Sequence, residues 1–128
     1  MRVLLDTNIL LWALIEPSRL SANVRGQLTD PELEVFFSAA SIWEIAIKAA
    51  LGRADFRVAP ERIFNEAVVR GFVELPVRSA AALKVAALPF HHRDPFDRLL
   101  IAQAMTEPAL FYTADAALEA YSDLVVRL

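Results

Sequence analysis

The sequence contains no cysteine among its 128 residues. Disulfide bonds and thiolate metal sites are therefore excluded, and the lack of cysteine fits a reducing compartment. Glycine is also scarce, with only three residues, and no glycine-rich loop of the kind that cradles phosphate groups is present. No apolar run reaches the roughly 18 residues that a membrane-spanning helix needs.

Positive charge is in short supply as well. Thirteen Lys and Arg residues stand against sixteen Asp and Glu, which gives a formal net charge of −3 and a pI of about 5.3. A dedicated nucleic-acid binder normally has the opposite balance. If some of the acids bind a metal, the deficit is partly offset there, and basic residues elsewhere can still be arranged unevenly. No small-residue cleavage site precedes the acidic Asp6, so we expect no signal peptide and a cytoplasmic location.

Hydrophobic residues, in contrast, are abundant: they make up 56% of the chain, with a mean hydropathy of +0.39. Two explanations fit this composition, a sheet that is buried on both faces or a further apolar surface that a partner covers. The length is sufficient for one full hydrophobic core, and no repeat, low-complexity stretch or linker divides the chain. We therefore expect a single domain over residues 1–128.

Short apolar runs alternate with helix-like segments along the whole chain. Proline and glycine mark several boundaries, such as Pro60 at the start of one helix and Gly52 at the end of another. The alternation predicts a three-layer α/β/α sandwich around a mostly parallel sheet. The expected strands are Val3–Asp6, Glu34–Ser38, Phe72–Leu75, Ala109–Thr113 and Leu124–Arg127, and the expected helices are Ile9–Ile15, Ala22–Leu28, Ile42–Leu51, Glu61–Arg70, Ser79–Leu88, Pro95–Met105 and Ala116–Tyr121.

Acidic residues recur where strands end or helices begin. Asp6 and Asp115 each close a strand-like run, and Glu44 and Asp97 lie in the first turns of apolar helical segments. In an α/β fold, such junctions can meet at one edge of the sheet. Carboxylates gathered there repel one another unless a divalent cation lies between them, so the pattern points to a metal site.

Each acid also has a plain structural explanation. Ser41 and Glu44 match the S-x-x-E capping box, and Glu44 stands four residues before Lys48, a spacing that suits a helical ion pair. Asp94, which precedes Pro95, is placed to cap the next helix, and a negative charge at Asp97 favours the dipole of the same helix. Taken singly, capping explains these acids.

Taken together, the acids favour the metal site. Capping is indifferent to Ser, Thr, Asn or Asp, yet carboxylates recur at these junctions. Ligand sets made only of oxygen suit hard cations such as Mg²⁺ or Mn²⁺. Magnesium held by carboxylates commonly binds phosphate-bearing substrates, so the expected chemistry is attack of a metal-activated water on a phosphodiester.

The remaining polar residues give weaker indications. His91 and His92 are adjacent in a connector and point to opposite sides, so we interpret them as exposed polar residues rather than as joint ligands. Trp43 is better explained by a core or a subunit interface than by substrate stacking. No histidine base lies near a serine or threonine in the sequence, so serine-type catalysis is not supported. Four basic residues lie near the acids in sequence and are candidate phosphate contacts: Lys48, Arg53, Arg93 and Arg98.

Four segments, taken in order, resemble one known family. They are Leu5-Asp6-Thr7-Asn8, the stretch Ser38–Lys48 with Ser41-Ile-Trp-Glu44 at its centre, the stretch Arg93–Ala102 with Asp94-Pro-Phe-Asp97, and Tyr112-Thr113-Ala-Asp115. The chain looks like a PIN-domain protein and is most similar to the VapC-type toxins of toxin–antitoxin systems. Each motif alone is weak evidence, whereas the ordered set of four is strong.

The resemblance implies a metal-dependent endoribonuclease. By motif position, Asp6, Glu44, Asp97 and Asp115 would hold Mg²⁺ or Mn²⁺, directly or through water. Asp94 would remain a helix cap, because Asp97 matches the family's third acid. The resemblance also assigns supporting polar roles to Thr7, Asn8 and Thr113.

The same resemblance implies an RNA substrate, a homodimer and inhibition by a cognate antitoxin that covers an apolar groove, for which Trp12, Leu14 and Ile15 are candidates. Two rival functions stay open on the sequence. One is another metal-dependent phosphohydrolase or nuclease, and the other is a non-catalytic PIN-like binding protein whose acids only cap helices.

Overall fold

The computed structural model describes residues 1–128, and a five-stranded sheet forms its centre. All strand pairs are parallel, and the strand order is β3-β2-β1-β4-β5. The strands are β1 (Arg2–Leu5), β2 (Glu34–Ser38), β3 (Val73–Leu75), β4 (Leu110–Thr113) and β5 (Val125–Arg127). None of the helices is long and apolar enough to cross a membrane.

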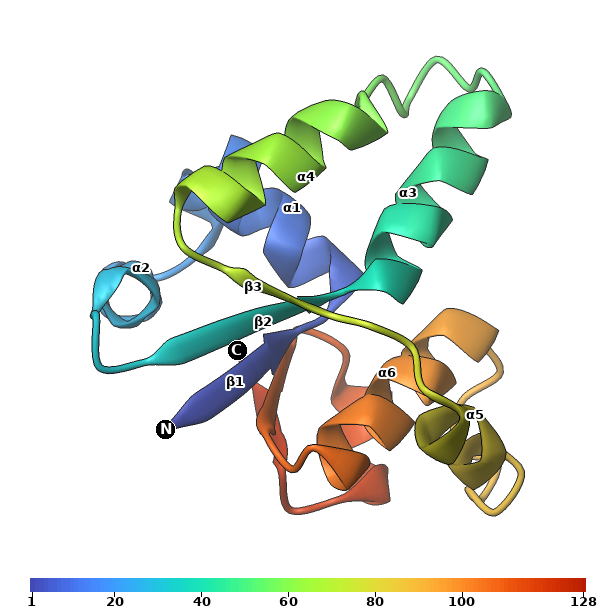
Figure 1. Cartoon of the computed structure of the whole chain (residues 1–128). Coiled ribbons are helices and arrows are strands. Elements are labelled where there is room, and N and C mark those ends of the chain that lie inside the picture. Colours follow the sequence, from blue (N-terminus) through green and yellow to red (C-terminus); the bar gives the residue numbers. More distant parts are fainter.

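Helices cover both faces of this sheet (Figure 1). The longer helices are α1 (Thr7–Ile15), α2 (Ala22–Thr29), α3 (Ala39–Ala50), α4 (Pro60–Val69), α5 (Ser79–Val85) and α6 (Pro95–Thr106), and two 3₁₀ segments complete the set, η1 (Pro17–Arg19) and η2 (Ala116–Tyr121). The predicted α/β/α sandwich with a parallel sheet is therefore confirmed. The predicted boundaries differ most for α3, which begins three residues earlier than expected.

The alternation of side chains along β1 divides the interior into two cores. Val3 and Leu5 pack in one core with α1, α2 and α4, whereas Leu4 packs in the other with α5, α6 and η2. Successive side chains of a strand point to opposite faces, so a continuously apolar strand serves two layers. The sheet buried on both faces thus accounts for much of the high apolar content.

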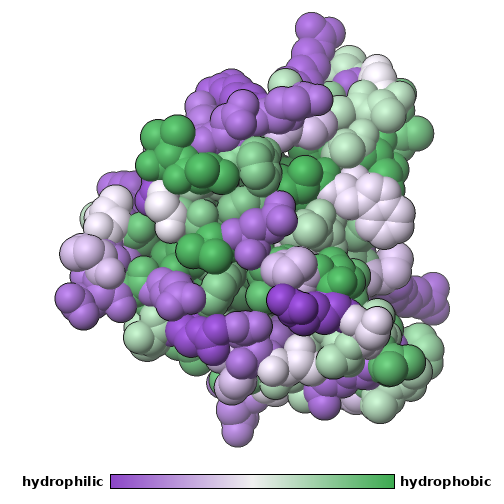
Figure 2. All heavy atoms as spheres, viewed as in Figure 1, coloured by the Kyte–Doolittle hydropathy of each residue, from purple (hydrophilic) through white to green (hydrophobic).

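Some apolar side chains remain on the surface. Figure 2 shows hydrophobic areas scattered between hydrophilic ones on one face, including the upper right, where α3 and the loop after it lie in Figure 1. Trp43, Ile47 and Leu51 are exposed along α3 and at its end. Leu14, a candidate for the expected apolar groove, is buried, whereas Trp12 and Ile15 are partly buried and pack against the core.

We expect the replacement Phe37→Ala to lower the free energy of unfolding by about 3–5 kcal/mol, because it leaves a cavity in a full core. Phe37 is completely buried in β2, and its ring meets the Phe64 ring edge-on at 6.0 Å. Chemical denaturation measures the change. The control Val69→Ala, at a position that is 86% exposed, should stay within about 0.5 kcal/mol of the parent; equal losses in both variants would contradict the prediction.

Candidate metal centre

The strand order of the sheet reverses between the neighbouring strands β1 and β4. The chain moves outward from β1 through β2 to β3 and then returns to add β4 on the other side of β1. Ligands of open parallel sheets bind at such switch points, beyond the carboxyl ends of the strands. Asp6 follows β1 directly, and Asp115 comes two residues after β4. Both acids therefore lie where a ligand site is expected.

Both oxygens of the buried Asp6 carboxylate accept hydrogen bonds. Its Oδ1 accepts a hydrogen bond from the backbone N–H of Ile9 at 2.7 Å and so caps α1. Its Oδ2 accepts from the hydroxyl of Thr113, a buried residue at the end of β4, at 2.5 Å. The neighbouring strands β1 and β4 are thus joined at the site by a side-chain contact in addition to their ladder.

Glu44 enters the site from the second turn of α3. Thr7 Oγ1 lies 2.7 Å from Glu44 Oε1 and 2.9 Å from Ser41 Oγ, and Lys48 Nζ lies 2.8 Å from Glu44 Oε2. The ion pair expected from the four-residue spacing is therefore present, although Glu44 is buried and Lys48 is half-exposed.

The capping box predicted for Ser41 and Glu44 is wrong. Helix α3 begins at Ala39, and its N-cap is Ser38, whose hydroxyl accepts from the backbone N–H of Ala40 at 3.0 Å. Ser41 and Glu44 therefore lie inside the helix, where neither can cap its start. This shift frees the Glu44 carboxylate from the backbone and leaves it facing the other acids.

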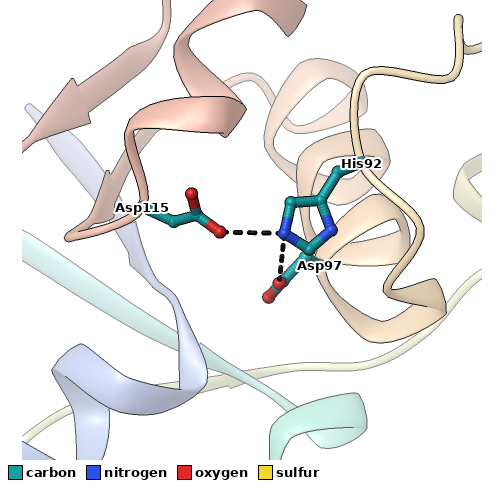
Figure 3. A group of neighbouring side chains, drawn as sticks. All are labelled: His92, Asp97 and Asp115. Atoms are coloured by element: carbon teal, nitrogen blue, oxygen red, sulfur yellow. Dashed lines mark hydrogen bonds and ion pairs between the residues drawn. The ribbon is translucent and has the colours of Figure 1, made fainter.

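Asp94 has the capping role that the sequence suggested. Asp94 caps α6, because its Oδ1 accepts from the backbone N–H groups of Phe96 at 2.8 Å and Asp97 at 3.3 Å. The Asp97 side chain, 21% exposed, has no cap to make and points toward Asp115 and His92 (Figure 3).

His92 belongs to this group, which the sequence interpretation missed. Its Nε2 lies 2.8 Å from Asp115 Oδ2 and 3.7 Å from Asp97 Oδ2, and one potential ligand atom from each of the three residues lies within 4.8 Å of the others (Figure 3). The available sequence sign was its position two residues before a helix-capping aspartate.

Burial makes the negative charges of the site costly. The pKa of Asp97 is raised to about 7, chiefly by burial and also by the charges of Asp94, Asp6 and Glu44, whereas His92 lowers it. Burial likewise raises the pKa of Asp6 to about 6, although hydrogen bonds from Thr113 and Ile9 oppose it. The shifts show that Asp6, Glu44 and Asp97 lie close enough to feel one another's charge.

This donor set fits a hard divalent cation. Carboxylate oxygens in a partly buried cluster, with a charge that is unfavourable in the absence of a counterion, suit Mg²⁺ or Mn²⁺. Asp97 and Asp115 each offer an oxygen to one group of ligand atoms within 4.8 Å of one another. Asp6 and Glu44 lie near enough to raise the pKa of Asp97, and their oxygens are partnered by Thr113, Thr7 and Lys48.

The supporting residues expected from the sequence separate into two kinds. Thr7 and Thr113 are buried and contact Glu44 and Asp6, respectively. Asn8, in contrast, is exposed and makes no side-chain hydrogen bond within the chain. Its amide is therefore free to meet a ligand but does not orient a carboxylate.

The four basic candidates also differ in position. Lys48 is paired with Glu44, Arg53 is exposed beside Asp55 at 3.2 Å, and Arg93 is exposed without an ion pair. Arg98 is buried, and its guanidinium donates to the carbonyls of Val85, Leu88 and Pro89 and to the Tyr121 hydroxyl. Because its donors are spent inside the protein, Arg98 leaves the set of candidate phosphate contacts.

A cavity of about 620 Å³ opens away from these acids. It lies between α2 and the turn that joins α4 to β3, and Leu20, Arg25, Leu28, Arg70 and Phe72 are among the residues that line it. None of the acids at the switch point lines this cavity, so the cavity is separate from the candidate metal centre.

Comparison with known proteins agrees with the fold. The family model described as PIN domain matches residues 3–124. Two similar solved structures are VapBC2 from Rickettsia felis bound to a DNA fragment from their promoter (TM-score 0.71, 13% identity, 100% of this chain and 98% of that chain) and FitAcB from Neisseria gonorrhoeae (0.65, 19%, 98% and 96%). A third is VapBC-1 from nontypeable Haemophilus influenzae (0.62, 18%, 99% and 98%). No curated protein sequence gives a significant match.

We expect Asp97→Asn to stabilise the metal-free protein increasingly as the pH rises from about 4 to about 7. Because the pKa of Asp97 is raised in the folded state, the folded protein keeps a proton that the unfolded chain has already released in this range. The stability cost is absent below the unfolded pKa and complete above the folded one. Urea unfolding of both proteins across this range measures the difference.

The matched control is Asp123→Asn, which removes an exposed aspartate just before β5. Its stability relative to the parent should lack the rise expected for Asp97→Asn. A flat difference for Asp97→Asn as well would mean that Asp97 does not titrate in this range.

Proposed function

The chain belongs to the PIN domain family, and we propose that it is a metal-dependent endoribonuclease, the toxin of a VapBC-type toxin–antitoxin system. The observation that carries the proposal is the meeting of carboxylates from separate parts of the chain at the switch point of the sheet. Asp6, Glu44, Asp97 and Asp115 come from the ends of β1 and β4 and from helices α3 and α6. Helix capping does not account for Glu44 and Asp97, because neither caps a helix here.

In this proposal the four carboxylates hold Mg²⁺ or Mn²⁺, directly or through water. When bound, the cation lowers the pKa of a bound water and offsets the charge that develops on the scissile phosphate. Thr113 holds Asp6 through Oδ2, and Thr7 holds Glu44 through Oε1. These contacts orient the carboxylates before the ion arrives, so less conformational freedom is lost on binding.

RNA contact in this proposal depends on single basic residues and not on a general positive field. Arg53 and Arg93 are exposed, and Lys48 lies beside Glu44, where it can meet a phosphate next to the site. The net charge of −3 makes non-specific attraction to the nucleic-acid backbone weak. The choice of RNA over DNA follows from the resemblance to VapC-type toxins.

The antitoxin partner and the homodimer are part of the same proposal. The similar structures named VapBC support a protein partner for this chain. Trp43 and Ile47 in α3 and Leu51 at its C-cap recur every fourth residue, with exposed fractions of 61%, 38% and 65%. Residues at this spacing share one side of a helix, so they form a stripe that suits a second copy of the chain.

We expect Asp6→Asn to reduce RNA cleavage by more than about 100-fold and to abolish growth inhibition. Loss of a residue that merely orients a ligand usually lowers activity by about 10- to 100-fold, and loss of a ligand itself should lower it more. Cleavage of labelled RNA with Mn²⁺ measures the change. The matched control is Asp94→Asn, which keeps a side chain able to cap α6 and should retain most of the activity. Full activity of Asp6→Asn would overturn the proposed metal chemistry.

The same assay separates the rival functions. Preferential cleavage of single-stranded DNA or of a chromogenic phosphodiester would assign the chain to another class of phosphohydrolase. If Mn²⁺ neither binds saturably nor raises the melting temperature, the acids have no metal function and a binding protein is the better description.

We expect Leu51→Glu and Ile47→Glu to convert a dimer into a monomer, since each buries a charge in an apolar interface. Light scattering coupled to size-exclusion chromatography measures the mass of each variant. Val69→Glu, at another exposed apolar position outside the stripe, should leave the mass unchanged. A dimer that persists in both α3 variants would rule out the stripe as its interface.

A further inference from the structure

The loop that joins α5 to α6 carries His92 to the metal centre. Its ring is partly buried, with 21% of the side chain exposed, and Nε2 faces both Asp115 and Asp97 (Figure 3). A histidine among carboxylates is commonly a ligand, and imidazole would bias the site toward transition metals. The hydrogen bonds of the other ring nitrogen decide whether ligation fits.

Nδ1 of His92 faces a donor. The backbone N–H of Asp94 donates to it at 3.0 Å, which requires a lone pair on Nδ1. In the neutral ring the proton is then on Nε2, so Nε2 is a donor and not a free lone pair. Its partner at 2.8 Å is Asp115 Oδ2, which accepts. Ligation through Nε2 would move the proton to Nδ1, where it would oppose the Asp94 N–H.

A second set of contacts holds the backbone of this loop. The Tyr121 hydroxyl accepts from the backbone N–H groups of His91 at 3.1 Å and His92 at 2.9 Å, and Arg98 Nη1 lies 3.1 Å from the same oxygen. Arg98 also donates to the Pro89 carbonyl at 2.9 Å. Because Arg98 follows Asp97 in α6, the element that supplies a carboxylate also anchors the loop that supplies the histidine.

Asp115 is the acid whose orientation depends most directly on His92. Its Oδ1 accepts from the backbone N–H of Ala117 at 2.9 Å at the start of η2, and its Oδ2 accepts from His92. The Asp115 side chain is 41% exposed and has no buried threonine partner like those of Asp6 and Glu44. Without the histidine, only one of its oxygens would keep a fixed contact.

We propose that His92 is a positioning residue of the metal centre, which donates a hydrogen bond from Nε2 to Asp115 and does not itself bind the cation. The inference rests on the proposed function for its metal centre, although it concerns the chain's own hydrogen bonds. It gives the histidine a role beside the four carboxylates and gives Arg98 and Tyr121 a role in holding it.

Two measurements on the unaltered protein test the assignment directly. Long-range proton–nitrogen correlation spectra of the metal-free protein, labelled with ¹⁵N-histidine, should show His92 protonated on Nε2 and not on Nδ1. Pulsed electron paramagnetic resonance of the Mn²⁺-loaded protein should show no nitrogen coupling from a directly coordinated imidazole. Protonation on Nδ1, or a coordinated nitrogen that disappears in His92→Gln, would overturn the proposal and make His92 a ligand.

Variants then measure the positioning effect. We expect His92→Ala to weaken Mn²⁺ binding by about 10- to 100-fold, the usual effect of removing a ligand-orienting partner. His92→Gln places an amide donor near the position of Nε2 and should recover most of the affinity. The control His91→Ala removes the exposed neighbouring ring, which meets Tyr121 edge-on at 5.0 Å, and should leave Mn²⁺ affinity within about threefold of the parent.

The outcomes separate this inference from the proposed function. Unchanged Mn²⁺ affinity in a folded His92→Ala protein would overturn the positioning role even if RNA cleavage is confirmed. Loss of affinity with rescue by His92→Gln would support it even if RNA is not the substrate. The proton–nitrogen correlation spectra need neither a folded variant nor a known substrate.

Discussion

The parallel strands and the helices that follow them bring several carboxylates to one edge of the sheet. Mutual repulsion among these carboxylates is the constraint around which the rest of the molecule is organised. Burial makes the repulsion severe, because it raises the pKa of Asp6 to about 6 and that of Asp97 to about 7. A fold gains nothing in stability from this arrangement unless a cation compensates it. The surrounding contacts are consistent with that cost: Thr113, Thr7 and Lys48 each hold one carboxylate oxygen.

The polar contacts around the site come from opposite ends of the chain. Thr113 joins the end of β4 to Asp6 at the end of β1, and Tyr121 and Arg98 fix the loop that carries His92. Arg98 shows how a charged residue in a motif can serve the interior instead of a substrate. Its guanidinium donates to the carbonyls of Val85, Leu88 and Pro89 at the end of α5 and in the loop that follows.

Local patterns predicted the architecture well, because they extend over only a few residues. These patterns are the spacing of apolar residues in helices and strands and the prolines and glycines that end them. All five strands and the helices between them were anticipated, with β2 matched at both ends. The acids at the junctions were also recognisable, as was the capping role of Asp94. The start of α3 was placed too late, because Ser38 and Ser41 are equally good caps by residue type. The packing of the buried Ser38 against Gln103, with their polar atoms 2.5 Å apart, accompanies the earlier start.

Fold class, strand number and the set of junction acids follow from the order of residues alone, since each depends on neighbours within a few positions. The partners of those acids do not. Thr113 reaches Asp6 across 107 residues, Thr7 reaches Glu44 across 37, and His92 reaches Asp115 across 23. These pairings exist because the crossover connections of a parallel sheet return distant segments to the same edge, which no local pattern encodes. Whether Glu44 caps or faces the site, whether Arg98 meets solvent and which histidine joins the acids were therefore settled by the folded chain.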